Sequence, residues 1–139
     1  MLQFLFDTDH LTLFDRGHAR VLQRHAAEPR DAVGISAVTI QEYLKGRLAA
    51  LARHQSGPLQ VQAYANLLAS LQLFQRFPIV PFDDACGNEF QHLRSLRLRI
   101  GSQDLRIAAV ALVHRLTVVT RNRRDFGRIP GLGLEDWSL

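Results

Sequence analysis

The sequence predicts an α/β protein in which a central parallel sheet of four to five short strands lies between two layers of helices. One observation is the alternation of short apolar runs with longer segments of helical periodicity, which is typical of βαβ units. A second observation is that carboxylates follow the ends of these runs, where parallel sheets bind their ligands. The length of 139 residues fits a single domain, residues 1–139, with its own core.

Two strands and three helical segments are expected in the first part of the chain. The first apolar run would be a central strand, because four of its five residues are apolar and it ends at Asp7 and Asp9. The longest segment is helical because Ile40, Leu44 and Leu48 recur at helical spacing. In chain order the elements are a strand at Leu2–Phe6, helical segments at His10–Phe14 and Ala19–Ala27, a strand at Ala32–Ile35 and a helix at Val38–Leu51.

The second part of the chain predicts three more strands and three helices. Pro81 marks the end of the third strand or an edge position, and Ser102 is a suitable N-cap for the last long helix. That helix is apolar almost all round, so we expect it to be buried. In chain order the elements are a loop at Ala52–Pro58, a helix at Leu59–Phe77, a strand at Ile79–Phe82, a helix capped by Asp83 or Asp84 and running to about Leu98, a helix containing Leu105–Val113, a strand at Thr117–Thr120, a polar loop at Arg121–Asp125 and an edge strand within Leu134–Leu139.

Composition indicates an ordinary globular protein, with 47% hydrophobic and 22% charged residues. The single cysteine, Cys86, excludes an internal disulfide and fits a reducing compartment. The N-terminal residues lack a basic segment, and no uncharged apolar run is long enough to span a bilayer. We therefore expect a cytoplasmic protein without a membrane partner.

The positive charge of the chain comes almost entirely from arginine. The net charge is +4, and Lys45 is the only lysine among 17 basic residues. Arginine binds phosphate through two parallel hydrogen bonds, so a clustered arginine surface suits a polyanion. An arginine-rich genome would give the same composition, so composition alone leaves both explanations open.

Four carboxylates are expected to meet at the carboxyl end of the sheet. Asp7 and its neighbour Asp9 follow the first strand, and Asp125 follows the strand at 117–120. Glu42 and Asp104 lie early in the helices that adjoin the second and fourth strands. Carboxylates that are far apart in sequence could therefore line one crevice.

Each of these acids also has a purely structural explanation. Asp104 could complement the helix dipole, which favours its charged form. Thr39 and Glu42 match a capping box, Asp7 or Asp9 could cap a helix, and Asp125 could be a turn residue. Clustered carboxylates nevertheless repel one another unless a cation neutralises them, and hard oxygen ligands suit Mg²⁺ or Mn²⁺. The six histidines show no metal-ligand spacing, which argues against a zinc site.

An acidic cation site among arginines is suited to hydrolysis of phosphodiesters. A bound cation activates water and stabilises an in-line displacement at phosphorus, while arginines hold the flanking phosphates. The arginines nearest the predicted site, which we expect to bind RNA, are Arg106, Arg121, Arg123 and Arg124. The residues alone thus indicate a metal-dependent nuclease.

Four segments carry a family resemblance that extends over essentially the whole chain. They are Leu5–Asp9, Ile35–Gly46, Ile100–Ala109 and Thr120–Phe126, followed by a similar tail at Ile129–Leu132 and Glu135–Trp137. In this order and spacing the sequence resembles the PIN-domain ribonucleases of the VapC type, the toxins of type II toxin–antitoxin pairs. The resemblance implies a PIN-like fold, homodimers, RNA cleavage that leaves a 5′-phosphate, and a cognate antitoxin that fills the active-site groove.

The resemblance also implies roles for individual residues. Asp7, Glu42, Asp104 and Asp125 would form the catalytic quartet that binds Mg²⁺ or Mn²⁺, with Asp7 and Asp104 as the principal ligands. The supporting residues would be Thr8, Asp9, Thr120 and Asn122. Asp9 departs from the family, which usually has asparagine there, and this extra carboxylate could tighten metal binding or shift metal preference.

Two other functions fit parts of the sequence. Asp7 and Asp9 after a first strand also resemble haloacid-dehalogenase-type phosphatases, but the only lysine is Lys45 and no acidic pair follows the strand at 117–120. A non-catalytic RNA-binding module with the same fold is the second alternative, although a phosphate-binding surface gains nothing from clustered carboxylates. Independently of the family, the apolar surface of the Leu59–Phe77 helix and of the helix from residue 104 fits a homodimer and packing within the chain equally well.

Overall fold

A computed structural model describes all residues, 1–139, and contains one five-stranded sheet in the order β3-β2-β1-β4-β5. Every neighbouring pair of strands is parallel. The strands are β1 (Phe4–Phe6), β2 (Val33–Ser36), β3 (Ile79–Val80), β4 (Thr117–Val119) and β5 (Leu134–Glu135). The expected parallel α/β sheet, with its first strand at the centre and its third and fifth at the edges, is confirmed.

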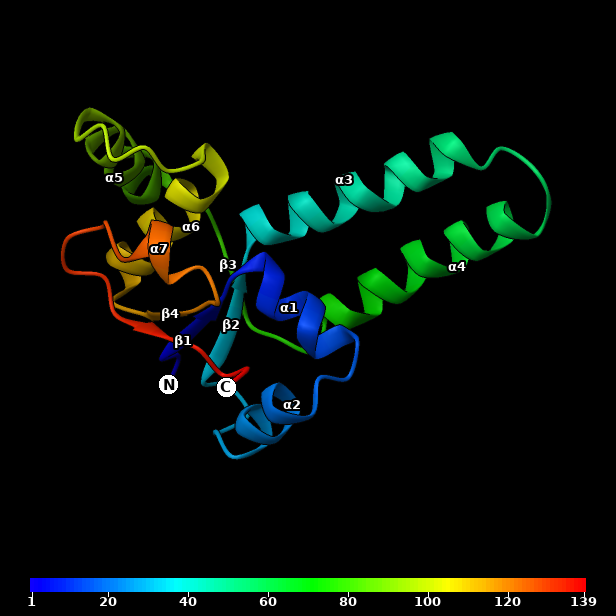
Figure 1. Cartoon of the computed structure of the whole chain (residues 1–139), viewed down its shortest axis with the longest axis horizontal. Helices are drawn as coiled ribbons and strands as arrows, with labels where there is room; N and C mark the ends of the chain where they lie inside the picture. Colours follow the sequence, from blue (N-terminus) through cyan, green and yellow to red (C-terminus); the bar gives the residue numbers. More distant parts are fainter.

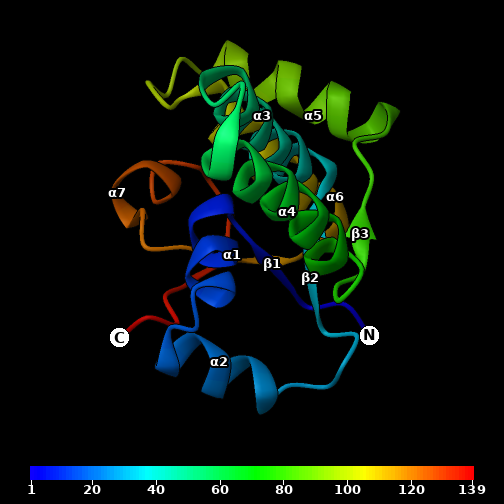
Figure 2. The same cartoon turned by 90° about the vertical axis from the view of Figure 1, so that its right-hand side faces the viewer.

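Helices cover both faces of this sheet (Figures 1 and 2). α5 and α6 lie on one side, and α1 and α2 lie on the other. α3 and α4 form a hairpin that extends well beyond the sheet. The helices are α1 (Thr8–Asp15), α2 (Ala19–Ala26), α3 (Ala37–Arg53), α4 (Gly57–Phe74), α5 (Asp84–Ser95), α6 (Ser102–His114) and α7 (Arg123–Phe126). None of them combines the length and the apolar composition that crossing a membrane requires.

The alternation of side chains along β1 builds a separate core on each face of the sheet. Leu5 packs into the core formed with α5 and α6, whereas Phe4 and Phe6 pack into the core formed with α1 and α2. Successive side chains of a strand point to opposite faces, and β1 is buried on both. A strand covered on both faces reads as a continuous apolar run, as the sequence does here.

The last long helix, α6, is buried within the chain as predicted. Its apolar residues from Leu105 to Ala111 belong to the core shared with α5. The expectation that this helix adds exposed apolar surface for a dimer is therefore wrong. Its predicted N-cap is also wrong, because Gly101 occupies the cap position, Ser102 is the first helical residue and no side chain caps the helix.

Three element boundaries differ from the predicted ones for local reasons. The helix that begins at Asp84, after its N-cap Asp83, ends at Ser95 rather than near Leu98, because Arg97 and Arg99 adopt positive φ angles of 53° and 57°. β3 ends at Val80 because Pro81 lacks a backbone N–H. The loop expected at 52–58 is shorter, since α3 runs to Arg53 and α4 begins at Gly57.

The segment predicted as a polar loop after β4 contains a short helix. Asn122 caps α7 by accepting a hydrogen bond from the backbone N–H of Asp125 at 3.3 Å. The sequence did not predict this helix, because α7 has a single turn and buries only Phe126. Asp125 therefore lies in a helical first turn, rather than in an irregular loop.

Candidate active site

Polar side chains from four segments line one pocket at the carboxyl end of the sheet. They come from the start of α1, from α3, from α6 and from the segment between β4 and α7, and no apolar residue is among them. The lining residues are Asp7, Thr8, Asp9, Glu42, Asp104, Arg121 and Asn122. Three members of the predicted quartet thus share this pocket.

Asp7 is held in place by the junction between β1 and α1. Its backbone N–H donates to Val119 of β4 at 3.1 Å, and its Oδ1 accepts from the N–H of His10 at 2.8 Å as the N-cap of α1. The residue is only 5% exposed. The cap explanation for Asp7 therefore holds, and it leaves Oδ2 without a hydrogen bond to the helix.

Glu42 is fixed by the side chain of Thr8 and has no role as a cap. Thr8 Oγ1 donates to Glu42 Oε1 at 2.6 Å and lies 3.1 Å from Thr39 Oγ1. The N-cap of α3 is Ser36, whose Oγ accepts from the N–H of Thr39 at 3.1 Å. The capping-box explanation of Glu42 is therefore wrong, and its carboxylate is directed to the pocket by Thr8.

Asn122 links the other two acids of the quartet. Its Nδ2 lies 3.4 Å from Asp104 Oδ2 and 3.1 Å from Asp125 Oδ2, and it donates to both. Its own backbone N–H donates to the buried Thr120 Oγ1 at 2.8 Å. Asp125 does not line the pocket. The structure thus brings Asp7, Glu42 and Asp104 into one cavity and places Asp125 next to them through Asn122.

The charge state of Asp104 differs from the sequence-based expectation. Burial, together with the negative charges of Asp7, Glu42 and Asp125, raises the pKa of this carboxyl to about 6, against the hydrogen bond from Asn122. Its position in the first turn of α6 does not compensate for these effects. The neighbouring carboxylates therefore favour a proton, or a cation, at this site.

Asp9 and Arg121 form an ion pair at the rim of the pocket. Arg121 Nε donates to Asp9 Oδ2 and Nη2 donates to Oδ1, both at 2.7 Å. This bidentate contact lowers the pKa of Asp9. The carboxylate that departs from the family pattern is thus neutralised by an arginine that the sequence assigned to RNA, so it adds little net charge to the pocket.

The other arginines assigned to RNA have different surroundings. Arg106 donates to Gln103 Oε1 at 2.6 Å, and its guanidinium lies 4.5 Å from the ring centroid of Phe90. Arg123 and Arg124 are exposed on α7. Of the four arginines assigned to RNA, Arg123 and Arg124 are therefore the two that form no ion pair and no stacking contact.

His10 is a buried polar residue at this site that sequence reasoning missed. Its Nε2 accepts from the backbone N–H of Trp137 at 3.2 Å, so the ring proton resides on Nδ1. Nδ1 has no hydrogen-bond partner and lies 3.7 Å from Asp7 Oδ1, which is too long for a hydrogen bond. No signal in the sequence marks this contact, because a histidine in a helical first turn is usually exposed.

The ligand atoms in the pocket suit a hard divalent cation. Asp7, Glu42 and Asp104 offer carboxylate oxygens, which Mg²⁺ and Mn²⁺ prefer. Asp7, Asp9 and His10 form a group there in which one ligand atom of each residue lies within 4.8 Å of the other two. Because Arg121 and Trp137 already engage Asp9 and His10, the donors that remain in the pocket are carboxylate oxygens of Asp7, Glu42 and Asp104.

A parallel sheet with an acidic pocket at its carboxyl end and arginines at the rim is the arrangement of an α/β nuclease. The sequence model of the PIN domain family matches residues 5–132. The chain therefore belongs to the PIN domain family, and the resemblance stated from its motifs is confirmed. This membership replaces the interpretation as a haloacid-dehalogenase-type phosphatase.

The relatives of the chain are VapC proteins. It is 26% identical to the tRNA(fMet)-specific endonuclease VapC of Salmonella typhimurium over 99% of both chains. It is 34% identical to Ribonuclease VapC4 of Mycobacterium tuberculosis over 70% of this chain and 71% of that protein.

Solved structures of VapBC complexes have the same fold. The DNA-bound VapBC of Salmonella typhimurium matches with a TM-score of 0.81 and 25% identity, covering 99% of each chain. VapBC2 of Rickettsia felis, bound to a promoter DNA fragment, matches with a TM-score of 0.76 and 25% identity, covering 98% of this chain and 99% of that one.

Proposed function

We propose that this chain is a metal-dependent endoribonuclease toxin that a cognate antitoxin neutralises. The observation that carries the proposal is the convergence of Asp7, Glu42 and Asp104 in one polar pocket of a PIN-domain chain. The names of its VapC relatives, which are ribonucleases and an endonuclease, support RNA as the substrate. Residues 1–139 would form one nuclease domain, because the sheet draws strands from Phe4 to Glu135.

Some residues of the pocket would bind the cation, and others would orient these ligands through hydrogen bonds. Asp7 and Asp104 would be the principal ligands of Mg²⁺ or Mn²⁺, with Glu42 and Asp125 completing the acidic quartet. A bound divalent cation supplies activation of water and neutralisation of charge at the scissile phosphate. Thr8 orients Glu42, and Asn122 orients both Asp104 and Asp125. Thr120 in turn fixes Asn122.

The arginines at the rim would hold the RNA backbone. Arg123 and Arg124 on α7 are exposed next to Asn122 and would contact phosphates. Arg121 would serve mainly to neutralise Asp9. Arg106 would contribute through long-range attraction, since its guanidinium stacks on Phe90. A phosphate-binding surface of this kind makes RNA affinity depend on salt.

Cleavage of RNA by the purified chain should require a divalent cation. With total RNA as substrate, Mg²⁺ or Mn²⁺ should give discrete products with 5′-phosphates, and chelation with EDTA should stop the reaction. Gel electrophoresis and end sequencing measure both results. Binding of RNA without cleavage in either metal would instead support the non-catalytic RNA-binding module.

An antitoxin partner is supported by the VapBC complexes that share this fold. The partner would enter the groove above the acidic pocket and so block access of RNA. Coexpression with the neighbouring open reading frame, followed by copurification and a cleavage assay, tests this. Full ribonuclease activity of the copurified complex would contradict it.

A homodimer is supported by an apolar stripe on α4. Val61, Tyr64, Leu68 and Leu71 are between 45% and 69% exposed and recur at the spacing of one helix face. Contiguous exposed apolar surface marks an interaction site. α4 belongs to the hairpin that extends beyond the sheet (Figure 1), so this exposed stripe is available to a second copy.

Light scattering should therefore find a dimer at micromolar concentration without antitoxin. Leu68→Glu should shift the chain to a monomer, because it places a charge in the centre of the stripe. Ala69→Glu is the matched control, because Ala69 is also exposed but lies about 100° further round α4, and it should leave the dimer intact. A monomeric wild-type chain would contradict the proposal.

A further inference from the structure

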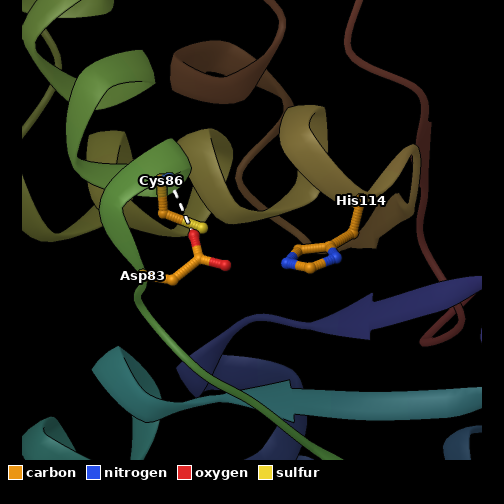
Figure 3. A group of neighbouring side chains, drawn as sticks. All are labelled: Asp83, Cys86 and His114. Atoms are coloured by element: carbon orange, nitrogen blue, oxygen red, sulfur yellow. Dashed lines mark hydrogen bonds between the residues drawn. The ribbon is translucent and has the colours of Figure 1, made fainter.

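Three side chains with metal-binding atoms meet at the end of the α5–α6 pair that is remote from Asp104. Asp83 and Cys86 lie at the N-terminus of α5, and His114 ends α6 (Figure 3). One ligand atom of each lies within 4.8 Å of the other two. At 1.5 Å per residue, His114 lies about 15 Å along α6 from Asp104, so this group is separate from the acidic pocket.

The environment of each side chain leaves a ligand atom available. Asp83 Oδ1 accepts from the N–H of Cys86 at 3.0 Å as the N-cap of α5, which leaves Oδ2 free. The thiol of Cys86 is buried, contacts the carbonyl oxygen of Pro81 at 3.8 Å and also interacts with the Asp83 carboxylate. The exposed imidazole of His114 faces the Asp83 carboxylate, and no hydrogen bond joins them.

We propose that Asp83, Cys86 and His114 form a zinc site that links the N-terminus of α5 to the C-terminus of α6. Thiolate sulfur, imidazole nitrogen and carboxylate oxygen are together the donor set of zinc rather than of Mg²⁺. Zinc bonds of about 2.0–2.3 Å place tetrahedral ligand atoms about 3.5 Å apart. The group needs to contract by at most about 1.3 Å, which rotation of the exposed Asp83 and His114 allows.

Coordination at this site is coupled to loss of the thiol proton. Burial raises the pKa of Cys86, so the free thiol is protonated and the metal displaces its proton to water on binding. Three protein ligands leave the fourth position of a tetrahedral zinc ion to water. The sequence argued against zinc because it has no local ligand spacing, whereas the antiparallel packing of α5 on α6 brings His114 to Cys86.

Cobalt substitution tests this site independently of RNA cleavage. The full chain, kept reduced with a phosphine, is titrated with Co²⁺. We expect one equivalent to produce the near-ultraviolet charge-transfer absorption of a cobalt–thiolate bond, and equimolar Zn²⁺ to remove it. The absorption should persist in Asp104→Asn, because the acidic pocket contains no sulfur. Absence of the absorption in the reduced wild-type chain would overturn the proposal.

Two variants with a matched control separate the site from adventitious binding by the thiol. Cys86→Ala should abolish the absorption, and His114→Ala should weaken Co²⁺ binding at least tenfold, since loss of even an outer-shell partner costs about 10- to 100-fold. His92→Ala, the matched control, removes an exposed histidine on α5 and should leave Co²⁺ binding unchanged. Wild-type affinity in His114→Ala, a surface substitution that leaves the core intact, would also overturn the proposal.

Discussion

Asp104→Asn should abolish RNA cleavage while the chain remains folded and still binds RNA. Asn has nearly the same shape as Asp and can still receive the hydrogen bond from Asn122. It removes one negative charge from the cation site, and metal stabilisation of several kcal/mol corresponds to a rate loss of about 100- to 1,000-fold. RNA affinity should not fall, because the exposed Arg123 and Arg124 remain and one repelling carboxylate is gone.

The matched control for this variant is Asp84→Asn. Asp84 also lies in the first turn of a helix, but it is exposed on α5 and far from the pocket. Cleavage of total RNA in Mg²⁺, filter binding and a melting curve are compared for the wild type and both variants. If folded Asp104→Asn cleaves as fast as the control, then Asp104 serves only the helix dipole and the proposed metal site is wrong.

Acidification should weaken Mg²⁺ binding by the wild type, because the cation has to displace a proton from Asp104. The pKa of this carboxyl is about 6 without metal, owing to burial and to the charges of Asp7, Glu42 and Asp125. Below that pH the observed affinity should fall about tenfold for each pH unit. Calorimetric titration with Mg²⁺ at pH values above and below 6 measures this change. Asp84→Asn should follow the wild type, and an affinity that is independent of pH would contradict the expectation.

The Asp104 carboxyl makes the metal-free chain less stable at neutral pH than at about pH 4. Its pKa in the folded chain lies above the ordinary value of 3.8, so the folded state binds more protons between about pH 4 and pH 6. The free energy of unfolding therefore falls as the pH rises through this window. In EDTA, Asp104→Asn should melt at a higher temperature than the wild type above about pH 6, and this difference should disappear below about pH 4.

The sequence was sufficient to predict that Asp7, Glu42 and Asp104 share one pocket, because this follows from the direction of the parallel strands. Residues that follow parallel strands meet at one end of a sheet, so Asp7 and the segment after β4 had to lie together. Glu42 and Asp104 could be added because each lies early in a helix beside a strand. These predictions needed only the order and period of apolar residues, which the sequence contains.

The side-chain partners could not be predicted, because they depend on where distant segments touch. Nothing in the sequence indicates that Arg121 pairs with Asp9 or that the N–H of Trp137 donates to His10. The pKa of Asp104 likewise depends on its distances to three other carboxylates. Its position in the first turn of a helix alone predicted a lowered pKa, whereas the pKa is raised. The short helix α7 was missed because a single turn is too short for apolar residues to recur at helical spacing.

Both edge strands of the sheet are very short. β3 has only two residues, with Pro78 before it and Pro81 after it, and β5 also has only two residues. Proline has no N–H to donate, and such short edge strands offer few unpaired backbone N–H and C=O groups to an incoming strand. Such edges disfavour a partner that would bind by extending the sheet. We therefore expect recognition of this protein to depend on helix faces and pockets, where side chains rather than backbone hydrogen bonds decide which partner fits.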